Sequence, residues 1–474
     1  MEWIFPRDLK SREEPEPAGY PLGLISAEDA TKNIIHNYLA NIYWQYFQQN
    51  RYKFYNRTKT TNKVDVVDFR TWDLDTLFEE IHTLFKSSLE ESKQLQKTDI
   101  YNFADILQIQ KDSKIYRPTL YDFLANNALA FYKTSETSIT KPAYQFKVDN
   151  PAFLSDAKKF SIVNLTSKDS LSLQFNALNI YQKIIQFHLK NNNLNALADI
   201  DIQRINFVNQ HATFNNKETI LLSTLESSKN NFKTNEISGL YAFEIAKIYR
   251  EKADKYLQTK DEKDRFKNKE ALEICNNVIK QFPKSLGAKK CIVLKSQIEQ
   301  KNIQITAEEY IPIDKNSRLL INYKNIDKLY FSGYKITKEQ IYQLNRTYKY
   351  DDKIAFINSL EKVKNWNAEL RNENDFLQHN TEVIVPKFNN GNYLIVASES
   401  EDLSEEKIYG TTTIQVTNLT LIENNFDGKY NYQIVDRNNG KPIKNAEIHL
   451  KNEKQRRGAS INKKLITDQN GFAS

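Results

Sequence analysis

The sequence predicts a multidomain chain in which an α-helical region precedes antiparallel β-sandwich domains. Up to about Lys301, apolar side chains recur every three to four residues, which is the period of a helix. Beyond that position they alternate every second residue, which is the period of a strand, and the intervening turns are rich in Asn and Gly. At 474 residues, 40% of them hydrophobic, the chain is long enough for several domains, each with its own core.

Changes in composition divide the chain into four segments. Residues 1–25 are rich in Pro and in charged side chains and are predicted to form a tail or linker. Residues 26–300 are the predicted helical region. Residues 303–400 are predicted to form a first β-sandwich with a helical insertion, and residues 411–474 a second β-sandwich that is incomplete.

The first three helices carry recognisable start signals. A helix entering near Ser26 is expected to bury one stripe of side chains, and either Asp73 or Asp75 is expected to cap the next helix. Pro118 suits the start of the third helix, because a missing N–H costs nothing in the first turn. The stripe expected on the first helix consists of Ile35, Tyr38, Leu39, Ile42, Tyr43 and Tyr46.

Six further helices are predicted downstream. The last three resemble tetratricopeptide-like hairpins, with a small residue at Ala271, an apolar residue at Val278 and a stop at Phe282 and Pro283. The period is too irregular for a true repeat array, so the prediction is an α-solenoid-like stack. The six helices are expected at residues 173–189, 196–210, 217–228, 241–257, 269–282 and 285–300.

Eight strands and one charged helix, from about Ile354 to Arg371, are predicted in the second part of the chain. The turn sequence at residues 468–471 demands a strand after it, and a sandwich without that strand would expose an unpaired edge. We therefore expect residues 451–474 to be poorly packed, and the natural protein to continue or this chain to be a split or truncated product. The strands are expected at residues 318–323, 328–334, 382–385, 393–397, 412–416, 419–422, 430–435 and 446–450.

Charge and hydropathy argue against nucleic acid and against a membrane span. The net charge of +7 comes from 67 basic and 60 acidic residues, which is a small imbalance over a large surface. The sharpest basic cluster, Lys451 to Arg457, is short and contains Glu453, so a solvated loop is the favoured interpretation. No stretch has the roughly 18 apolar residues that a membrane span needs. The first residues do not form a signal peptide.

The two cysteines, Cys275 and Cys291, do not form a disulfide framework. Both lie in apolar helical patterns, and two buried thiols are the favoured interpretation. A single bridge between antiparallel helices in an oxidising compartment is the alternative. Neither cysteine has a His or Cys partner at metal-ligand spacing.

Chemistry-bearing motifs are missing from the sequence. It contains no phosphate-binding loop, no dinucleotide fingerprint and no nucleophile elbow, so we predict no catalytic, cofactor-binding or metal-ligating residues and no cofactor. The spacing of Asp65, Asp68, Asp73 and Asp75 is not that of a calcium loop. Aromatic side chains between Tyr43 and Tyr55 are explained better by core packing than by stacking on sugars or bases. The six histidines are far apart in the sequence: His36, His82, His188, His211, His379 and His449.

Several segments resemble the alpha-macroglobulin family, in the large envelope forms of Bacteroidetes-type bacteria. Residues 43–51, 71–78 and 117–125 look like the helical N-terminal region that precedes the macroglobulin domains of such proteins. Residues 317–326 and 391–398 resemble parts of an early macroglobulin domain. A following macroglobulin domain is indicated by residues 436–443 and 467–471, a motif also found in the sandwich domains of carboxypeptidases and in transporter plugs.

The resemblance implies a periplasmic or surface protease trap. Members of the family present a bait segment, are cleaved, change shape and enclose the protease, and some capture it through a Cys-x-Glu-Gln thioester. This chain departs from that pattern, because Cys275 is followed by Asn276 and Cys291 by Ile292, and because neither a bait region nor an export signal is recognisable.

The leading hypothesis is therefore a non-enzymatic N-terminal scaffold portion of an alpha-macroglobulin-like endopeptidase inhibitor in the cell envelope. Its partners would be endopeptidases, engaged through downstream parts, and other envelope proteins. The alternative is an envelope binding module, built of helical repeats and a sandwich, for a protein or glycan partner. An enzyme ranks third, since no set of acid, base and nucleophile is visible in the sequence.

Overall fold

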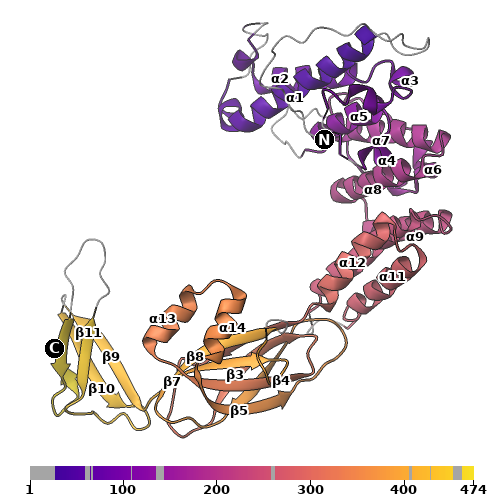
Figure 1. Cartoon of the computed structure of the whole chain (residues 1–474). Helices are drawn as coiled ribbons and strands as arrows, with labels where there is room; N and C mark the ends of the chain where they lie inside the picture. The colour runs from indigo at the N-terminus through magenta and orange to yellow at the C-terminus, as the bar shows by residue number, and fades with distance from the viewer. Residues whose placement is uncertain are drawn as a thin grey trace, which may run out of the picture. The chain divides into compact units, whose positions relative to one another are not determined.

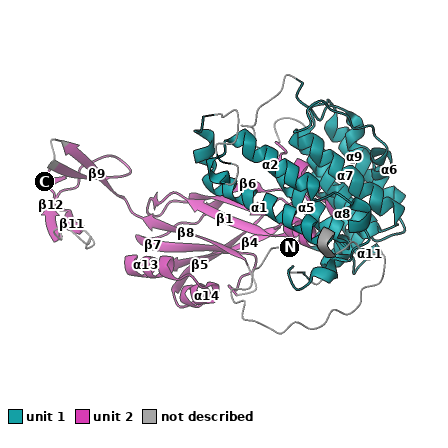
Figure 2. Cartoon of the chain, turned by 90° about the horizontal axis from the view of Figure 1, so that it is seen from above, with its two compact units in different colours: residues 1–248, 274–292 teal, residues 249–273, 293–474 magenta. Residues whose placement is uncertain are grey.

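The computed structural model describes residues 27–58, 65, 68–107, 109–110, 112–134, 144–257, 262–404, 408–426, 429–451 and 462–473. The predicted tail at 1–25 and Ser26, the predicted entry of the first helix, lie outside these residues. The chain divides into two compact units, coloured separately in Figure 2. Unit 1 comprises residues 1–248 and 274–292, and unit 2 comprises residues 249–273 and 293–474.

Among the described residues up to 299, the named elements are helices (Figure 1). Those predicted after residue 173 are present within a few residues of their expected bounds. The long helices are α1 (Ala27–Tyr55), α2 (Leu74–Ser87), α5 (Leu120–Tyr132), α7 (Leu173–Lys190), α8 (Leu194–His211), α9 (Lys217–Asn231), α10 (Ser238–Asp254), α11 (Lys267–Gln281) and α12 (Leu286–Glu299). Short turns of helix are η1 (Phe69–Thr71), α3 (Ser92–Leu95), η2 (Ile100–Phe103), α4 (Ser113–Tyr116), η3 (Pro151–Leu154) and α6 (Ala157–Ser161).

The buried face of α1 is not the predicted stripe. Ile35 of that stripe is 49% exposed, and the side chains that are buried lie mostly one position away. Two of them are polar, and the Asn37 amide donates to Ser88 Oγ and to the Leu124 carbonyl, at 3.1 Å each. The prediction was wrong because it counted only apolar residues, whereas an amide with partners is also compatible with burial. The buried residues of α1 are Ala30, Asn33, Ile34, Asn37, Ala40, Trp44, Phe47 and Phe54.

Side-chain caps fix the starts of α2 and α5. Asp73 is the N-cap of α2 and accepts a hydrogen bond from the Thr76 N–H at 2.9 Å. In α5 the N-cap is Thr119, whose hydroxyl and the Asp122 carboxylate form a capping box. The predicted start at Pro118 is therefore two residues too early, because the Thr119 side chain satisfies the exposed N–H groups of the first turn.

The first β-region consists of two facing sheets in unit 2. One has the strand order β1-β3-β6 and the other β2-β8-β7-β4-β5. All pairs are antiparallel except β2 with β8. Buried side chains of both sheets, including Leu319, Phe331 and Ile395, form one core between them. The strands are β1 (Asn302–Ala307), β2 (Tyr310–Ile311), β3 (Ser317–Lys324), β4 (Lys328–Lys335), β5 (Glu361–Glu369), β6 (His379–Val385), β7 (Gly391–Ser398) and β8 (Tyr409–Val416).

Two helices, α13 (Lys338–Arg346) and α14 (Tyr350–Asn358), connect β4 to β5. Their apolar side chains pack with Leu394 and Val396 of β7, so they cover the outer face of the five-stranded sheet. A helical insertion is therefore present, but the predicted helix at 354–371 is wrong, since residues 361–369 form β5. Charged side chains are tolerated in β5 because it is an edge strand, and Trp366 stacks on Phe331 with ring centroids 5.2 Å apart.

The last strands form a smaller pair of sheets with the orders β13-β10-β9 and β11-β12. Their core is small and contains Tyr432, Ile434, Ile448, Leu465 and Ala473. The strands are β9 (Leu419–Phe426), β10 (Lys429–Asp436), β11 (Glu447–Lys451), β12 (Asn462–Ile466) and β13 (Phe472–Ala473).

The predicted turn at residues 468–471 leads into β13, which pairs with β10. Gly471 has φ +76°, and a Cβ there would lie 2.5 Å from the Ile434 carbonyl oxygen, so the turn needs glycine. The expectation of poor packing is wrong for residues 462–473, because β12 and β13 are paired and bury Leu465 and Ala473. Residues 452–461 lie outside the described part of the chain.

These elements confirm the predicted fold class of a helical region followed by antiparallel β-sheets. The predicted domain boundaries stay predictions. Among the described helices, none combines the length and the apolarity needed to cross a membrane.

Candidate functional site

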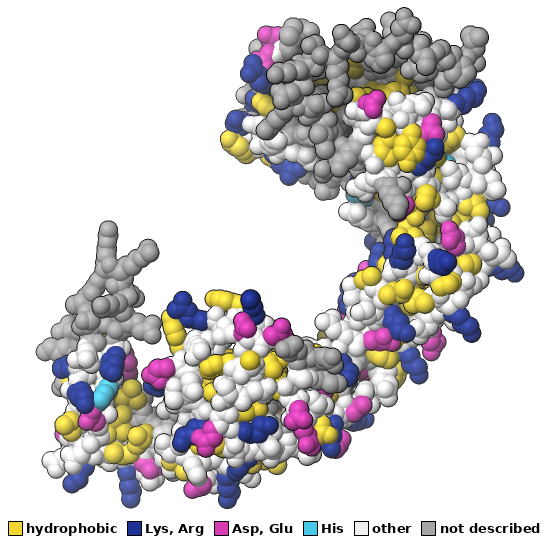
Figure 3. Space-filling model, viewed as in Figure 1, with side chains coloured by type: hydrophobic (Ala, Val, Ile, Leu, Met, Phe, Trp, Pro, Cys, Tyr) yellow, Lys and Arg dark blue, Asp and Glu magenta, His cyan; other side chains and the backbone are white. Residues whose placement is uncertain are grey.

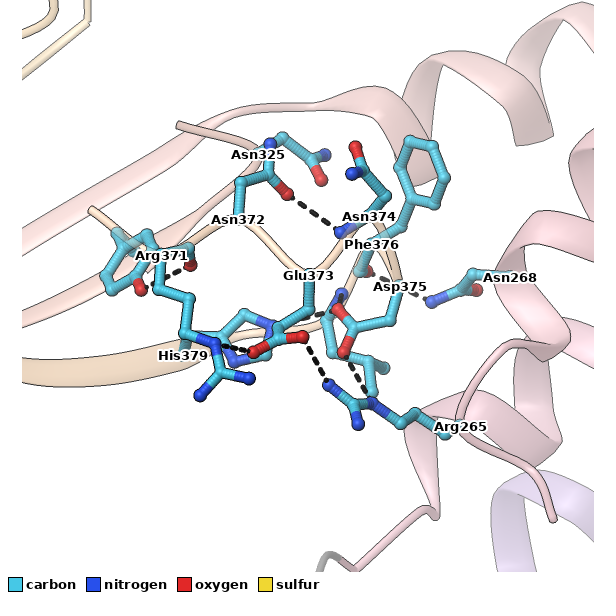
Figure 4. A network of polar contacts seen from close by, with 12 residues as sticks. Arg265, Asn268, Asn325, Arg371, Asn372, Glu373, Asn374, Asp375, Phe376 and His379 are labelled. Atoms are coloured by element: carbon cyan, nitrogen blue, oxygen red, sulfur yellow. Dashed lines mark hydrogen bonds and ion pairs between the residues drawn. The ribbon is translucent and has the colours of Figure 1, made fainter. Parts of the chain in front are cut away.

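A polar network within unit 2 connects the start of α11 with the loop between β5 and β6 (Figure 4). Arg265 and Asn268 come from the helical side, and Glu373, Asp375 and His379 come from the sheet side. We call these five residues the Arg265 clamp. Its two sides are distant in the sequence, since 110 residues separate Arg265 from Asp375.

Asp375 is the centre of the clamp, and its side chain is only 2% exposed. Its carboxylate accepts hydrogen bonds from Arg265 Nε at 3.1 Å, from His379 Nε2 at 2.8 Å and from the Leu377 N–H at 3.1 Å. Burial acts to raise the pKa of Asp375, but the hydrogen bonds from His379, Leu377 and Arg265 outweigh it and hold this pKa below its usual value. The clamp therefore contains a buried carboxylate that is kept ionised.

Arg265 binds two carboxylates at once. In addition to Asp375, its Nη2 lies 3.1 Å from Glu373 Oε2, and Glu373 also pairs with Arg371. A guanidinium presents several donors in a fixed plane, so one arginine can hold two acidic residues of the same loop in place. The arginine thereby sets the position of the loop relative to the start of α11.

The loop held by the clamp has an unusual backbone. Asn374 and Phe376 both have positive φ, at 54° and 59°. Asn268 donates to the Phe376 carbonyl at 3.1 Å, and Asn372 accepts from the Asn374 N–H at 3.0 Å. Left-handed backbone at non-glycine residues costs free energy and persists only where surrounding contacts impose it. The clamp residues supply such contacts.

A second polar network lies inside unit 1, around Arg204 of α8. Arg204 is fully buried and donates to Asp201 and to the carbonyls of Phe153 and Ser155, and its guanidinium lies 4.5 Å from the Phe160 ring centre. Tyr241 donates to Asp201 at 2.9 Å. Burial, followed by the charge of Asp201, raises the pKa of Tyr241 well above its usual value. This network fastens η3 and α10 to α8.

Both networks have the properties of structural joints. In each of them the acidic groups accept hydrogen bonds from neighbouring basic, hydroxyl or backbone donors. A catalytic acid or base instead needs a pKa close to the operating pH and access to a substrate. The chemistry supported by these groups is therefore positioning of backbone segments.

The histidines singled out in the sequence are dispersed in the structure as well. His188 contacts Asp122 at 2.9 Å, His82 contacts the Tyr132 hydroxyl at 2.8 Å, and His379 belongs to the clamp. His211 contacts Gln174 at 3.1 Å, and His449 contacts Glu447. Within the part of the chain that the structure describes, no group of three or more His, Cys, Asp and Glu side chains is arranged to hold a metal ion.

The acidic and aromatic residues singled out in the sequence also make structural contacts. Asp73 caps α2 and Asp68 caps η1 while pairing with Arg70 at 2.7 Å. Trp44, Phe47 and Phe54 of the aromatic run are buried, which confirms the core-packing interpretation for these three. In the basic cluster, residues 452–457 lie outside the described residues. On the face drawn in Figure 3, basic side chains are interspersed with acidic ones and do not gather into a single patch.

The fold defines a class: a protein in which helices precede antiparallel β-sheets, with two networks of buried ionic groups among the described residues that hold backbone segments in place. The sequence matches no family model and no curated protein. Among solved structures, the chain is distantly similar to the native alpha-2-macroglobulin of Escherichia coli, in a structure that spans domains MG0-NIE-MG1, at 14% identity and a TM-score of 0.28. This match covers 36% of the chain and 56% of that structure, so the chain spans little more than half of its length.

Two further structures show similarity. One is the NIE-MG1 part of the same Escherichia coli protein, with 12% identity, a TM-score of 0.26, and coverage of 37% of this chain and 86% of that one. The other is the CARDB domain of a Pyrococcus furiosus protein, with 14% identity, a TM-score of 0.15, and coverage of 25% and 92%. Because these TM-scores are low, the fold class rests on the chain's own helices and strands.

Proposed function

We propose that this chain is a non-catalytic scaffold from the N-terminal part of an alpha-macroglobulin-like inhibitor of endopeptidases. The observation that carries the proposal is the order of the architecture. A helical region precedes antiparallel β-sheets, and the segments that resemble the family follow the same order, with 43–51 in α1, 117–125 at the start of α5 and 317–326 beginning in β3.

The scaffold role fits the chemistry of the chain. The Arg265 clamp and the Arg204 network hold backbone segments in fixed positions. A domain needs such internal rigidity if a shape change elsewhere in the protein is to move the domain as one body. In this proposal the natural protein acts in the cell envelope, and it engages the endopeptidase through bait and capture segments outside residues 1–474.

The proposal is tested with the natural protein that contains this chain. An enclosed protease is shielded from large molecules but remains accessible to small ones. Incubation of the protein with a broad-specificity endopeptidase should therefore abolish cleavage of a large protein substrate while leaving cleavage of a short chromogenic peptide largely unchanged. This chain alone is the matched control and should protect neither substrate.

Two outcomes would count against the proposal. If the natural protein leaves cleavage of the large substrate unchanged, it is not a trap. If this chain alone blocks cleavage of the short peptide, it acts as an ordinary active-site inhibitor rather than as a scaffold.

The second candidate is an envelope binding module, and exposed tyrosines on the helical insertion favour it. Tyr342 is 52% exposed, Tyr348 is 89% exposed and Tyr350 is 43% exposed. Tyrosine offers a large rigid apolar face with a polar tip, which suits contact surfaces for proteins and sugars. Under this alternative, the chain alone should bind an envelope protein or glycan, and Tyr348→Ala should weaken binding at least several-fold.

A further inference from the structure

The chain's two cysteines lie opposite each other in one helical hairpin. Cys275 belongs to α11 and Cys291 to α12, both are fully buried, and they are not joined by a disulfide. The Cys275 thiol is near enough to Cys291 to raise the pKa of the Cys291 thiol by hydrogen bonding. Two buried thiols on different helices of the hairpin therefore lie near each other.

The position of each cysteine along its helix explains this proximity. Cys275 lies six residues before the end of α11 (281 minus 275), and Cys291 lies five residues after the start of α12 (291 minus 286). Four residues, 282–285, connect the helices, so α11 and α12 are antiparallel neighbours. At a rise of about 1.5 Å per residue, nearly equal offsets from the turn place the two cysteines at the same level of the hairpin.

We propose that Cys275 and Cys291 are a disulfide-forming pair, and that their oxidation fastens α11 covalently to α12. A disulfide brings its sulfur atoms to about 2.05 Å. Because the two cysteines lie at the same level of an antiparallel hairpin, the bond joins neighbouring positions of the two helices. The bond would form whether or not the natural protein is a protease trap, because it depends only on the hairpin and on the supply of an oxidant.

Burial determines when the bond forms. Within unit 1, α12 contacts α10 so closely that a Cβ on Gly287 would lie 2.6 Å from the carbonyl carbon of Gly239. The hydrogen bond with Cys275, together with burial, raises the pKa of the Cys291 thiol and keeps it protonated in the closed hairpin. Since the thiolate is the reacting species, exchange requires the hairpin to open. Oxidation is therefore expected during folding and to be slow afterwards.

The reaction balances with a low-molecular-weight disulfide as the oxidant. The thiolate of one cysteine attacks a sulfur atom of glutathione disulfide, which forms a mixed disulfide and releases one glutathione thiolate. The second cysteine, deprotonated in the open hairpin, then attacks the protein sulfur of the mixed disulfide and releases the second glutathione. The protein loses two hydrogen atoms, and the oxidant is reduced to two thiols.

The test uses the full chain refolded from denaturant, either in a glutathione redox buffer or in a reducing buffer. N-ethylmaleimide then labels remaining thiols under denaturing conditions, before mass spectrometry and tryptic mapping. The oxidised sample should take up no label and should yield residues 270–280 linked to residues 291–295. The reduced sample should take up two labels, and its Tm should be several degrees lower.

Single variants are the controls, and they keep the proposal falsifiable. Cys275→Ser and Cys291→Ser should each give only a mixed glutathione disulfide. The oxidised and reduced samples of each variant should lack the Tm increase of several degrees that oxidation gives the wild-type chain. Two labels on the oxidised wild-type chain would overturn the proposal. Mixed disulfides on both cysteines, or bridges only between chains, would overturn it as well, because either result means that the two thiols do not meet.

Discussion

The guanidinium of Arg265 donates from Nε to Asp375 at 3.1 Å, and this contact joins the start of α11 to the loop between β5 and β6. The arginine side chain is 17% exposed and the aspartate side chain 2% exposed. Removal of one partner of such a buried ion pair lowers stability strongly, because the other charge stays buried without a partner. Replacement of both partners by apolar side chains would cost much less. The stability of unit 2 should therefore depend on this pair.

Replacement of Asp375 tests that dependence. Asp375→Asn removes the charge and weakens the hydrogen bonds with Arg265 and His379, which should lower the free energy of unfolding by about 2–3 kcal/mol. Urea denaturation followed by circular dichroism measures the change. The control is Glu382→Gln, which breaks the exposed Arg318–Glu382 pair of the same unit and should have little effect. Equal small effects of both variants would show that the clamp is dispensable.

The lowered pKa of Asp375 gives the clamp a defined pH dependence. A carboxylate whose pKa is lower in the folded state contributes stability that is complete above its unfolded value, 3.8, and is lost as the pH falls through the folded value. The stability difference between wild type and Asp375→Asn should thus shrink as the pH falls below about 4. Urea midpoints measured from pH 3 to 7 check this, and a difference that grows on acidification would contradict it.

The buried amide of Asn37 yields a prediction for α1. Asn37→Leu leaves the Leu124 carbonyl and the Ser88 hydroxyl without this donor, which should cost about 1–3 kcal/mol of stability. The matched control is Ile35→Thr at the neighbouring exposed position, which should change stability little. Thermal denaturation of both variants decides which of the two faces of α1 is packed. If Ile35→Thr destabilised the protein more than Asn37→Leu, the stripe expected from the apolar residues alone would be the packed face.

The close approach of α10 and α12 predicts that alanine is tolerated less well at Gly287 than at Gly239. Alanine is normally favoured over glycine in a helix by about 1 kcal/mol. At Gly287 the added methyl would meet the backbone of Gly239, whereas at Gly239 it would meet the side chain of Val278 at 2.9 Å. Gly287→Ala should therefore be clearly the more destabilising of the two, because a side chain can move and a backbone cannot. Comparison of their Tm values checks the order.

Periodicity predicted the fold class because it reflects local geometry. The change from a period near 3.6 to a period of 2 at about residue 301 separates α12 from β1, and caps such as Asp73 mark a helix start with their own side chain. These signals depend only on neighbours in the sequence. The same is true of the turn at 468–471, which signalled a following strand. The prediction that this strand is missing was wrong, because β13 follows the turn and pairs with β10.

The clamp and the buried face of α1 were not predictable in this way. Arg265 and Asp375 are ordinary charged residues in the sequence, and only the fold brings them together across 110 positions. In the sequence, Asn37 looks like a solvent-exposed residue. Only the fold shows that its amide is buried and donates to Ser88 and Leu124. The strand β5 was missed because a charged edge strand lacks the strong alternation of a buried one, and its pairing with β4 decides its conformation.

The Arg265 clamp has a mechanical consequence. Within unit 2, the Arg265–Asp375 pair and the Asn268–Phe376 hydrogen bond join the start of α11 to the loop between β5 and β6. A pulling force on this segment is shared between these contacts, so neither contact bears the whole load. Loss of the salt bridge would transfer the load to the remaining contacts.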